Sequence, residues 1–403
     1  MAVNLPEMGE LLPVAGIQLG CSSAGIRYQG RNDLAVIRLD PGSVVGGVFT
    51  RSSFRAPPVA VAAANCGLAR GLVINSGNAN AATGETGLRD AHASCEMLAT
   101  HIACDAQEIL PFSTGVIGEF LPMDRVAQGI DAAASRLNDH GWADAARAIM
   151  TTDTAPKAVS GRFEVMQRTV TATAMVKGSG MIRPDMATLL AFLGMDAAVS
   201  PETCARLVRD LADRSFNRLT IDGDTSTNDS FVVMATGQAG GDAIEAGSNG
   251  YDALLDGLTP LVVELAQRTV RDGEGATKFV TIDVVDGRDS DECLQVAYTV
   301  AHSPLVKTAI FAGDPNWGRF CMAIGRAGID GLDPCGISLY LDDVTVAEGG
   351  LVAGSYSEDD AVRVMARDEY VITIRLGRGA ASETIWTSDL SYEYVRINAE
   401  YRT

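Results

Sequence analysis

One glycine-rich segment of the chain combines residue types that can carry acyl-transfer chemistry. It spans residues 177–190 and reads KGSGMIRPDMATLL. Gly178 and Gly180 permit positive φ and close backbone approach, and Pro184 disfavours helix at the residue before it. We therefore expect a bent, strained segment that leads into a buried strand near Thr188. Such strain favours an N→O shift of an acyl group onto the threonine hydroxyl. The plain alternative is a glycine turn followed by a threonine on a strand.

The chain contains no competing catalytic signature. It has no GxSxG nucleophile elbow, no GxxxxGK[ST] phosphate loop and no GxGxxG dinucleotide motif. Its four histidines and eight cysteines form no HExxH, HxxxH or CxxC pattern, so a zinc site is not expected. The remaining interpretation is a hydroxyl or thiol nucleophile whose base is something other than histidine.

Length and composition are those of an ordinary globular protein. The 403 residues are enough for one large core or for two to three lobes, and 47% of them are hydrophobic. A net charge of −19 without a basic cluster repels phosphate backbones, so we expect no nucleic-acid partner. The N-terminal residues lack a signal-peptide pattern, and no apolar run approaches the roughly 18 residues of a membrane span. With the scattered cysteines, this favours a cytoplasmic location and no membrane partner.

The predicted strands and helices that must position the glycine-rich segment do not follow a regular βαβ order. Hydrophobic spacing predicts strands over 35–40, 44–50, 71–75, 109–112, 163–176, 187–192, 336–341, 370–375, 383–386 and 392–397. It predicts helices over 88–102, 123–137, 143–150, 201–214 and 251–270. Ser200 is the expected N-cap of the fourth of these helices. The mixture favours an α/β fold of layered mixed or antiparallel sheets packed with helices, and neither a Rossmann nor a TIM fold.

Short motifs along the whole chain resemble the ornithine acetyltransferase family, also called bifunctional glutamate N-acetyltransferases. In order, they are VFT (48–50), APPV (56–59), NSGNANAATG (75–84), STGVIG (113–118), TTDT (151–154), the segment 177–190, DGDTSTND (222–229), SPLVKTAI (303–310), DPNWGR (314–319) and NAEYRT (398–403). Family members often have His, Asn and Cys where this chain has Arg183, Asp185 and Ala82. None of these departures is the proposed nucleophile, and the first two bear on the rate of cleavage.

The resemblance implies a self-processing enzyme with an N-terminal nucleophile and two α/β lobes, the first ending near Ala187. Thr188 Oγ attacks the Ala187 carbonyl, and water opens the resulting ester. The products are an α chain, residues 1–187, and a β chain, residues 188–403, which family members assemble as α2β2 or larger. The freed α-amino group has an ordinary pKa of about 7.7–8.0, so it can accept the proton of the hydroxyl on its own residue.

The reaction implied by the resemblance is ping-pong acetyl transfer in arginine biosynthesis. Thr188 takes acetyl from N-acetylornithine and passes it to glutamate, which gives N-acetylglutamate. Thr114 and Gly115 match the family's oxyanion hole. The residues that match its substrate-binding positions are Thr151, Lys177, Thr188, Glu274, Asn398 and Thr403, the last through its carboxylate.

Some questions stay open at this point. The sequence favours Thr151 over Thr152 as the substrate contact without deciding between them. No cofactor and no metal are implied. Acetyl-CoA is an undecided second donor, since no CoA-binding motif is readable. An amidase or aminopeptidase that uses the same processed nucleophile is the alternative function.

Overall fold

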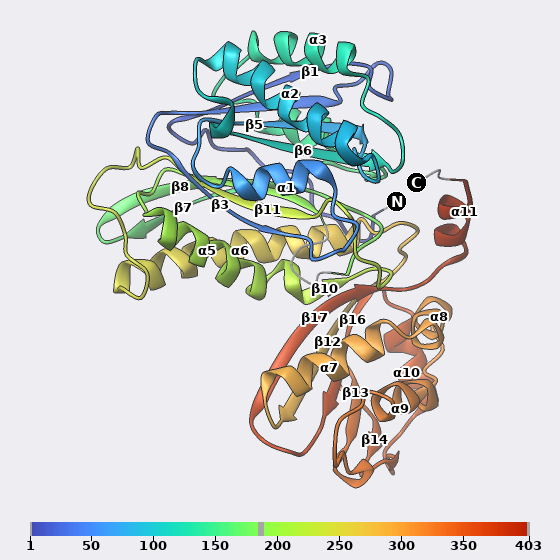
Figure 1. The fold of residues 1–403 in the computed structure, drawn as a ribbon. Helices are drawn as coiled ribbons and strands as arrows, with labels where there is room; N and C mark the ends of the chain where they lie inside the picture. The colour runs from blue at the N-terminus through green and yellow to red at the C-terminus, as the bar shows by residue number, and fades with distance from the viewer. Residues whose placement is uncertain (1, 184–188, 401–403) are drawn as a thin grey trace. The chain divides into compact units, whose positions relative to one another are not determined.

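The computed structural model describes residues 2–183 and 189–400, which form two compact units (Figure 1). The larger unit comprises residues 7–183, 189–217 and 225–269, and the smaller one residues 2–6, 218–224 and 270–400. The predicted cleavage point between Ala187 and Thr188 lies outside the described residues, and the chain on both sides of it belongs to the larger unit. The compact units are thus distinct from the predicted α and β chains, and that division stays a prediction.

The larger unit contains two β-sheets. The strand order is β1-β2-β5-β6 in the first sheet and β4-β3-β11-β9-β8-β7 in the second. The strands of the first sheet are β1 (Ile17–Ser22), β2 (Leu34–Leu39), β5 (Gly71–Asn78) and β6 (Ile109–Val116). Those of the second are β3 (Val44–Phe49), β4 (Gly67–Leu68), β7 (Lys157–Val165), β8 (Arg168–Lys177), β9 (Leu190–Met195) and β11 (Ser230–Ala235). Both sheets mix parallel and antiparallel pairs, as the sequence predicted.

Helices cover the outer faces of these two sheets, which gives the larger unit four layers (Figure 1). One core lies between the sheets, where Phe112 of β6 meets Phe192 of β9 edge to face at 5.1 Å. A second core lies under α2 and α3, and α5 and α6 pack on the other sheet. The helices are α1 (Pro57–Ala64), α2 (Gly84–Ile102), α3 (Met123–Ala134), α4 (Trp142–Ala148), α5 (Pro201–Arg214) and α6 (Asn249–Arg271).

Strands β5 and β6 run parallel, so their carboxyl ends meet at one edge of the first sheet. All eight residues of β5 are buried, and β6 is buried apart from a partly exposed Gly115. Such continuous burial is typical of strands covered on both faces. It explains why the apolar runs GLVIN and ILPF read clearly as strands, although the structure extends each of them into the polar motif that follows.

Most predicted elements are confirmed, with shifted ends. The helix 201–214 has the predicted bounds, and its N-cap Ser200 accepts a hydrogen bond from Thr203 N at 3.1 Å. The single run 163–176 is instead most of the hairpin β7–β8, which turns at Met166 and Gln167, both with positive φ.

One predicted strand, 392–397, is wrong. These residues belong to helix α11 (Tyr392–Glu400). The alternation of Tyr, Val and Ile with charged residues resembles a strand, but Arg396 pairs with Glu393 and Glu400 at helical spacing. Ser391 Oγ also accepts the N–H of Tyr394 at 3.3 Å, which satisfies a donor of the first turn.

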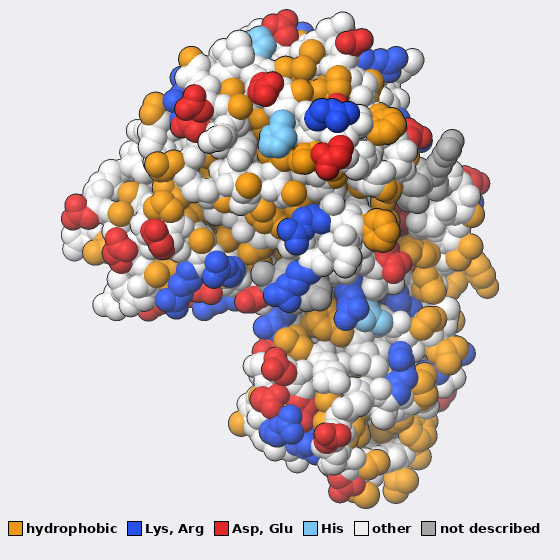
Figure 2. Space-filling view, viewed as in Figure 1, with side chains coloured by type: hydrophobic (Ala, Val, Ile, Leu, Met, Phe, Trp, Pro, Cys, Tyr) orange, Lys and Arg blue, Asp and Glu red, His pale blue; other side chains and the backbone are white. Residues whose placement is uncertain are grey.

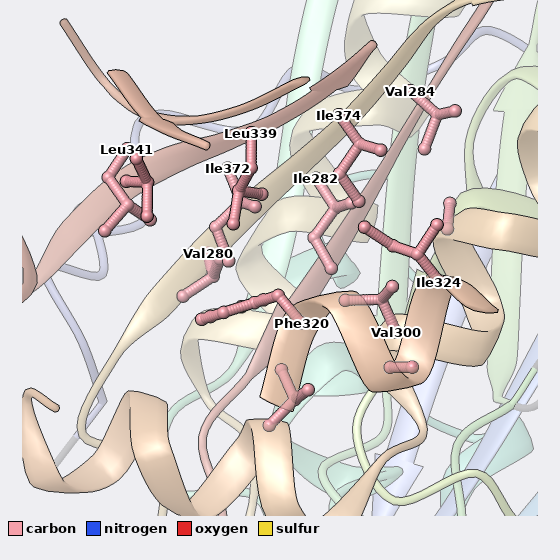
Figure 3. Packing of buried hydrophobic residues seen from close by; sticks show 14 of the residues in the cluster. Val280, Ile282, Val284, Val300, Phe320, Ile324, Leu339, Leu341, Ile372 and Ile374 are labelled. Atoms are coloured by element: carbon pink, nitrogen blue, oxygen red, sulfur yellow. The ribbon is translucent and has the colours of Figure 1, made fainter. Parts of the chain in front are cut away.

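The smaller unit is a seven-stranded sheet with order β10-β17-β12-β16-β13-β14-β15. Its strands are β10 (Leu219–Thr220), β12 (Phe279–Gly287), β13 (Ser338–Leu341), β14 (Val344–Glu348), β15 (Leu351–Val352), β16 (Glu369–Arg375) and β17 (Ala381–Ser388). Its remaining helices are α7 (Ser290–Ala301), α8 (Pro304–Ala312), α9 (Trp317–Gly325) and α10 (Glu358–Met365). Alternate residues of β12 and β16 point into one apolar core, which Phe320 and Ile324 of α9 complete (Figure 3). No helix in the described ranges is long and apolar enough to cross a bilayer.

A buried ion pair ties two segments of the larger unit together. Asp153 follows α4, and its side chain is completely buried with that of Lys157. Its Oδ1 accepts hydrogen bonds from Lys157 Nζ and from Gly178 N, each at 2.7 Å. Its Oδ2 accepts the N–H of Thr151 at 2.9 Å. One carboxylate therefore fixes both the turn before β7 and the end of β8.

We predict that Asp153→Asn lowers the free energy of unfolding by about 3–5 kcal/mol, because it removes the carboxylate from the buried Lys157 ammonium. The pKa of Asp153 is lower in the folded than in the unfolded protein. Its contribution is therefore complete above the ordinary carboxyl pKa of about 4 and is lost as pH falls through the folded value. Urea denaturation of both proteins at several pH values measures this, and the difference between them should shrink in acid.

Asp144→Asn is the matched control for this measurement. Asp144 is exposed and pairs with Arg147 at 3.3 Å, so its loss should change stability by less than about 0.5 kcal/mol. Equal losses in the two variants would contradict the role given to Asp153.

Candidate active site

Two glycines bring the ends of β5 and β6 into close contact. Gly77 and Gly115 are register partners with φ of 98° and 134°. A Cβ atom on Gly115 would lie 2.2 Å from the carbonyl carbon of Gly77, and one on Gly77 would lie 2.7 Å from Cβ of Arg27. A side chain at Gly115 would therefore push the strand ends apart, and one at Gly77 would collide with the segment at Arg27. This contact places Thr114, the residue before Gly115, at the edge of the sheet, where it is 8% exposed.

Buried amide side chains stabilise the carboxyl ends of β5 and β6 through hydrogen bonds. Asn75 Oδ1 accepts a hydrogen bond from Ser113 Oγ at 2.6 Å, and Asn75 Nδ2 donates to the Asn78 carbonyl at 2.8 Å. Asn228, from the loop before β11, donates to the carbonyl oxygens of Ser113 and Ala79 at 2.9 and 2.6 Å. The NSGNANA, STGVIG and DGDTSTND motifs therefore meet in one hydrogen-bonded network around Thr114 and Gly115.

Lys177 reaches Thr114 from the second sheet. It is the last residue of β8, and its Nζ donates to Thr114 Oγ1 at 3.2 Å. The next residue, Gly178, has φ of 155° and donates its N–H to Asp153, as described above. Thr151, whose N–H binds the other oxygen of the same carboxylate, is thereby tied to the Lys177–Gly178 segment. Four predicted site residues, Thr114, Gly115, Lys177 and Thr151, thus belong to one connected group.

The bend after Lys177 differs in one detail from the sequence prediction. Gly178 has the expected positive φ, but among the described residues of the bend the second one with positive φ is Met181, at 56°, and not Gly180. A positive φ is costly for methionine, so the backbone is strained a few residues before the predicted cleavage point. Ser179 is buried, and its hydroxyl hydrogen-bonds that of Thr152 at 2.7 Å.

Two buried carboxyl groups act on Lys177, and their pKa values shift in opposite directions. Burial alone would raise the pKa of Asp153, but the ammonium groups of Lys157 and Lys177, with the hydrogen bonds above, hold it well below its ordinary value. Burial raises the pKa of Asp229 well above its ordinary value, against the opposing effects of Ser226 and Lys177. Asp153 is therefore the more acidic of these two carboxyl groups.

Glu274 and Asn398 lie together in the smaller unit. Asn398 Nδ2 donates to Glu274 Oε2 at 2.8 Å. Ser391 Oγ fixes the loop of Glu274 by donating to the Gly275 carbonyl at 2.6 Å. The Asp389 carboxylate fixes the other end of this loop, where it accepts the N–H and hydroxyl of Thr277 at 2.8 and 2.6 Å.

A buried lysine, Lys307, binds the segment that carries Asp389 and so supports the loop of Glu274 indirectly. Lys307 of the SPLVKTAI motif donates to Thr387 Oγ1 at 3.2 Å and to the Ser388 carbonyl, directly before Asp389. Burial lowers its pKa to about 8, although the charges of Asp389 and Asp222 oppose the shift. The motif thus has a structural task that its sequence did not indicate.

Three predicted site residues, Ala187, Thr188 and Thr403, lie outside the described residues, as does Asp185. Leu189, the first described residue after Thr188, is 3% exposed, and its carbonyl accepts the N–H of Ser230 at 2.8 Å. Within residues 2–183 and 189–400, no three His, Cys, Asp or Glu side chains could hold a metal ion.

Sequence reasoning missed the residues that support the site. Asp153 stands four residues before Lys157, a spacing that could have indicated an ion pair in a chain with only four lysines. Gly77 and Gly115 stand two and three residues after an apolar strand run, a position that could have indicated a close approach. Asn228 carries no such signal, because its partners are backbone carbonyls distant in sequence.

This arrangement is suited to stabilising a developing negative charge on an acyl oxygen. A hydroxyl, Thr114, stands next to a glycine N–H at the carboxyl edge of two parallel strands, with a lysine ammonium within hydrogen-bond distance of the hydroxyl. Such donors, fixed before the reaction, are worth far more in a partly buried site than in water.

The chain is similar to known proteins along its whole length. The chain is 52% identical over 405 residues to the arginine biosynthesis bifunctional protein ArgJ of Pseudomonas syringae pv. tomato, and the match covers all of both chains. A solved structure of the bifunctional protein ArgJ from Bacillus halodurans is 34% identical, covers 51% of this chain and 96% of its own, and has a TM-score of 0.49. An ornithine acetyltransferase of Mycobacterium tuberculosis, solved with ornithine, is 34% identical and covers 45% of this chain and 96% of its own, with a TM-score of 0.39.

The family model that matches is that of ArgJ, and the match spans residues 18–403. With a full-length relative at 52% identity, the conclusion is direct: this chain belongs to the ArgJ family.

Proposed function

We propose that this chain is an acetyltransferase of arginine biosynthesis that moves acetyl from N-acetylornithine to glutamate. The observation that carries the proposal is the meeting of Thr114, Gly115, Lys177 and Thr151, which come from separate motifs, in one connected group. The full-length likeness to a bifunctional ArgJ protein supports the same reaction.

The first chemical step is cleavage of the chain. Thr188 Oγ attacks the carbonyl carbon of Ala187, the C–N bond breaks, and the resulting ester is opened by water. The products are the carboxylate of Ala187 and a free α-amino group on Thr188. Two observations support this step: the backbone is strained at Met181, before the bond, and the Leu189 carbonyl after it is held by the N–H of Ser230.

Acetyl transfer then uses the new amino group as the base. It accepts the proton of the Thr188 hydroxyl as Oγ attacks the acetyl carbonyl of N-acetylornithine. The Thr114 hydroxyl and the Gly115 N–H donate to the oxyanion, and ornithine leaves with the proton. The glutamate amine attacks the acetyl-threonine in the second half-reaction, which releases N-acetylglutamate and restores the free hydroxyl.

Substrate recognition follows the charges of the two amino acids. Lys177 pairs with the α-carboxylate, and Glu274 with Asn398 takes a substrate amine. Thr151 is favoured over Thr152, because the Thr152 hydroxyl already binds Ser179. Thr403 is the remaining proposed contact to substrate. The proposal includes no metal or cofactor, and acetyl-CoA is an acetyl donor to be tested beside N-acetylornithine.

The proposal also covers the state of the protein in the cell. We infer a cytoplasmic location and an assembly of two α and two β chains, with no nucleic-acid or membrane partner. All eight cysteines are free, which is typical of a reducing compartment.

Product analysis tests the reaction. Purified protein with N-acetylornithine and glutamate should release ornithine and N-acetylglutamate in equal amounts, with the parallel double-reciprocal lines of ping-pong kinetics. Acetyl-CoA replaces N-acetylornithine in a parallel assay. Release of acetate at the same rate without glutamate would instead establish a hydrolase.

We predict that Thr188→Ala blocks both cleavage and acetyl transfer, since it removes the hydroxyl that attacks in each. The wild-type protein should give two fragments on a denaturing gel, the smaller of similar size to residues 1–187, and the β fragment should begin TLLAFL. Thr188→Ser keeps a hydroxyl and should still cleave. An uncut wild-type chain with full activity would disprove the mechanism.

We predict that Thr114→Val lowers kcat by about 10²–10³-fold, because it removes one donor to the oxyanion while keeping the size of the side chain. Steady-state kinetics on the cleaved fraction measures this change. Thr100→Val is the control, since the Thr100 hydroxyl is exposed and bonds only within helix α2, to the Glu96 carbonyl. A kcat for Thr114→Val within twofold of wild type would remove Thr114 from the oxyanion hole.

A further inference from the structure

The contact between Lys177 and Thr114 has a fixed polarity. An ammonium group has three donors and no acceptor, so Thr114 Oγ1 must accept in the 3.2 Å contact with Lys177 Nζ. The hydroxyl hydrogen of Thr114 therefore points away from Lys177. A threonine hydroxyl without such a neighbour rotates among several orientations, and only one of them serves an oxyanion.

Lys177 is itself held in place. Its backbone pairs with Leu190 in the ladder between β8 and β9. The following N–H, on Gly178, is bound by the buried Asp153 carboxylate at 2.7 Å. The Lys177 ammonium and that carboxylate also attract each other. Figure 2 shows Asp and Glu side chains scattered over the visible face, in keeping with the net charge of −19.

We propose that Lys177 is a positioning residue for the oxyanion hole, in addition to any contact that it makes with substrate. By donating to Thr114 Oγ1, it directs the Thr114 hydrogen toward the acyl oxygen and makes that hydrogen a stronger donor, since a hydroxyl that accepts from a cation donates more strongly. Asp153 holds the backbone from which Lys177 reaches. This inference rests on the proposed function, because it concerns the same acetyl-transfer step.

An acetyl donor without a carboxylate separates the two roles of Lys177. Wild-type and Lys177→Met proteins are incubated with 4-nitrophenyl acetate, and acetylation of Thr188 is followed by release of nitrophenol and by mass. This ester has no carboxylate for Lys177 to bind. We expect Lys177→Met to slow acetylation by the ester roughly tenfold, less than the loss of a direct donor. Lys278→Met is the control, since Lys278 Nζ donates to the carbonyls of Ala366 and Arg367 in the smaller unit.

A double-mutant cycle tests whether the effect passes through Thr114. In a Thr114→Val background there is no hydroxyl to direct, so adding Lys177→Met should change the ester rate less than twofold. If Lys177→Met acetylates at the wild-type rate with the ester and loses only affinity for N-acetylornithine, the lysine binds substrate alone and the inference is overturned. Independent effects of the two mutations on the ester rate would overturn it as well.

Two further variants keep the test decisive if Lys177→Met is not cleaved. Lys177→Arg retains a donor-only cation and should keep most of the ester rate. Lys177→Gln has an amide oxygen that can accept the Thr114 hydrogen, so it should lose that rate. Equal ester rates in these two variants would overturn the inference while leaving the proposed function intact. A wild-type protein that neither donor acetylates would overturn the proposed function itself.

Discussion

The buried carboxylate of Asp153 is the interaction on which the site depends. It lies in a place where an ionised group is costly, and it is retained because Lys157, Gly178 N and Thr151 N satisfy its oxygens. Lys157 and Gly178 lie at the open end of the β7–β8 hairpin, and Thr151 lies in the turn before it. The ladder to β9 holds Lys177, and the carboxylate holds the N–H of Gly178, the first residue of the glycine bend.

The second constraint is steric. Gly115 lets two parallel strands end in contact, and Gly77 makes room for Arg27 beside them. The amide groups of Asn75 and Asn228 donate hydrogen bonds to backbone carbonyls of the polar segments that follow. The strands supply rigidity, because they are buried on both faces, and the loops supply donors. The hydrogen-bond donors of the site thus lie on loops, and the strands that flank these loops set their positions.

Much of the fold was predictable because apolar runs in covered sheets and amphipathic helices are strong local signals. Helix 201–214 and its Ser200 cap follow from such signals alone. The prediction failed where local pattern and tertiary context disagree. The turn at Met166 and Gln167 uses two residues that rarely take positive φ, and the alternating 392–397 is helical because of its charge spacing and cap. In the site, the motifs indicated Thr114, Gly115 and Lys177 as functional residues. Asp153 and Asn228 lie in motifs as well, but their supporting roles depend on contacts to Gly178, Ala79 and Ser113, which are distant in sequence.

The ladder between β8 and β9 has a consequence for the refolding of the protein after cleavage. The two strands pair from Ala172↔Met195 to Lys177↔Leu190 in the interior of a six-stranded sheet, and the proposed cut falls in the connection between them. Before the cut, that pairing closes a short loop at little entropic cost. After it, the same pairing joins two separate polypeptides, and regaining it from the unfolded state becomes a second-order encounter. A cut molecule that unfolds would thus not readily refold. The lifetime of the active enzyme would then depend on how slowly its sheet unfolds.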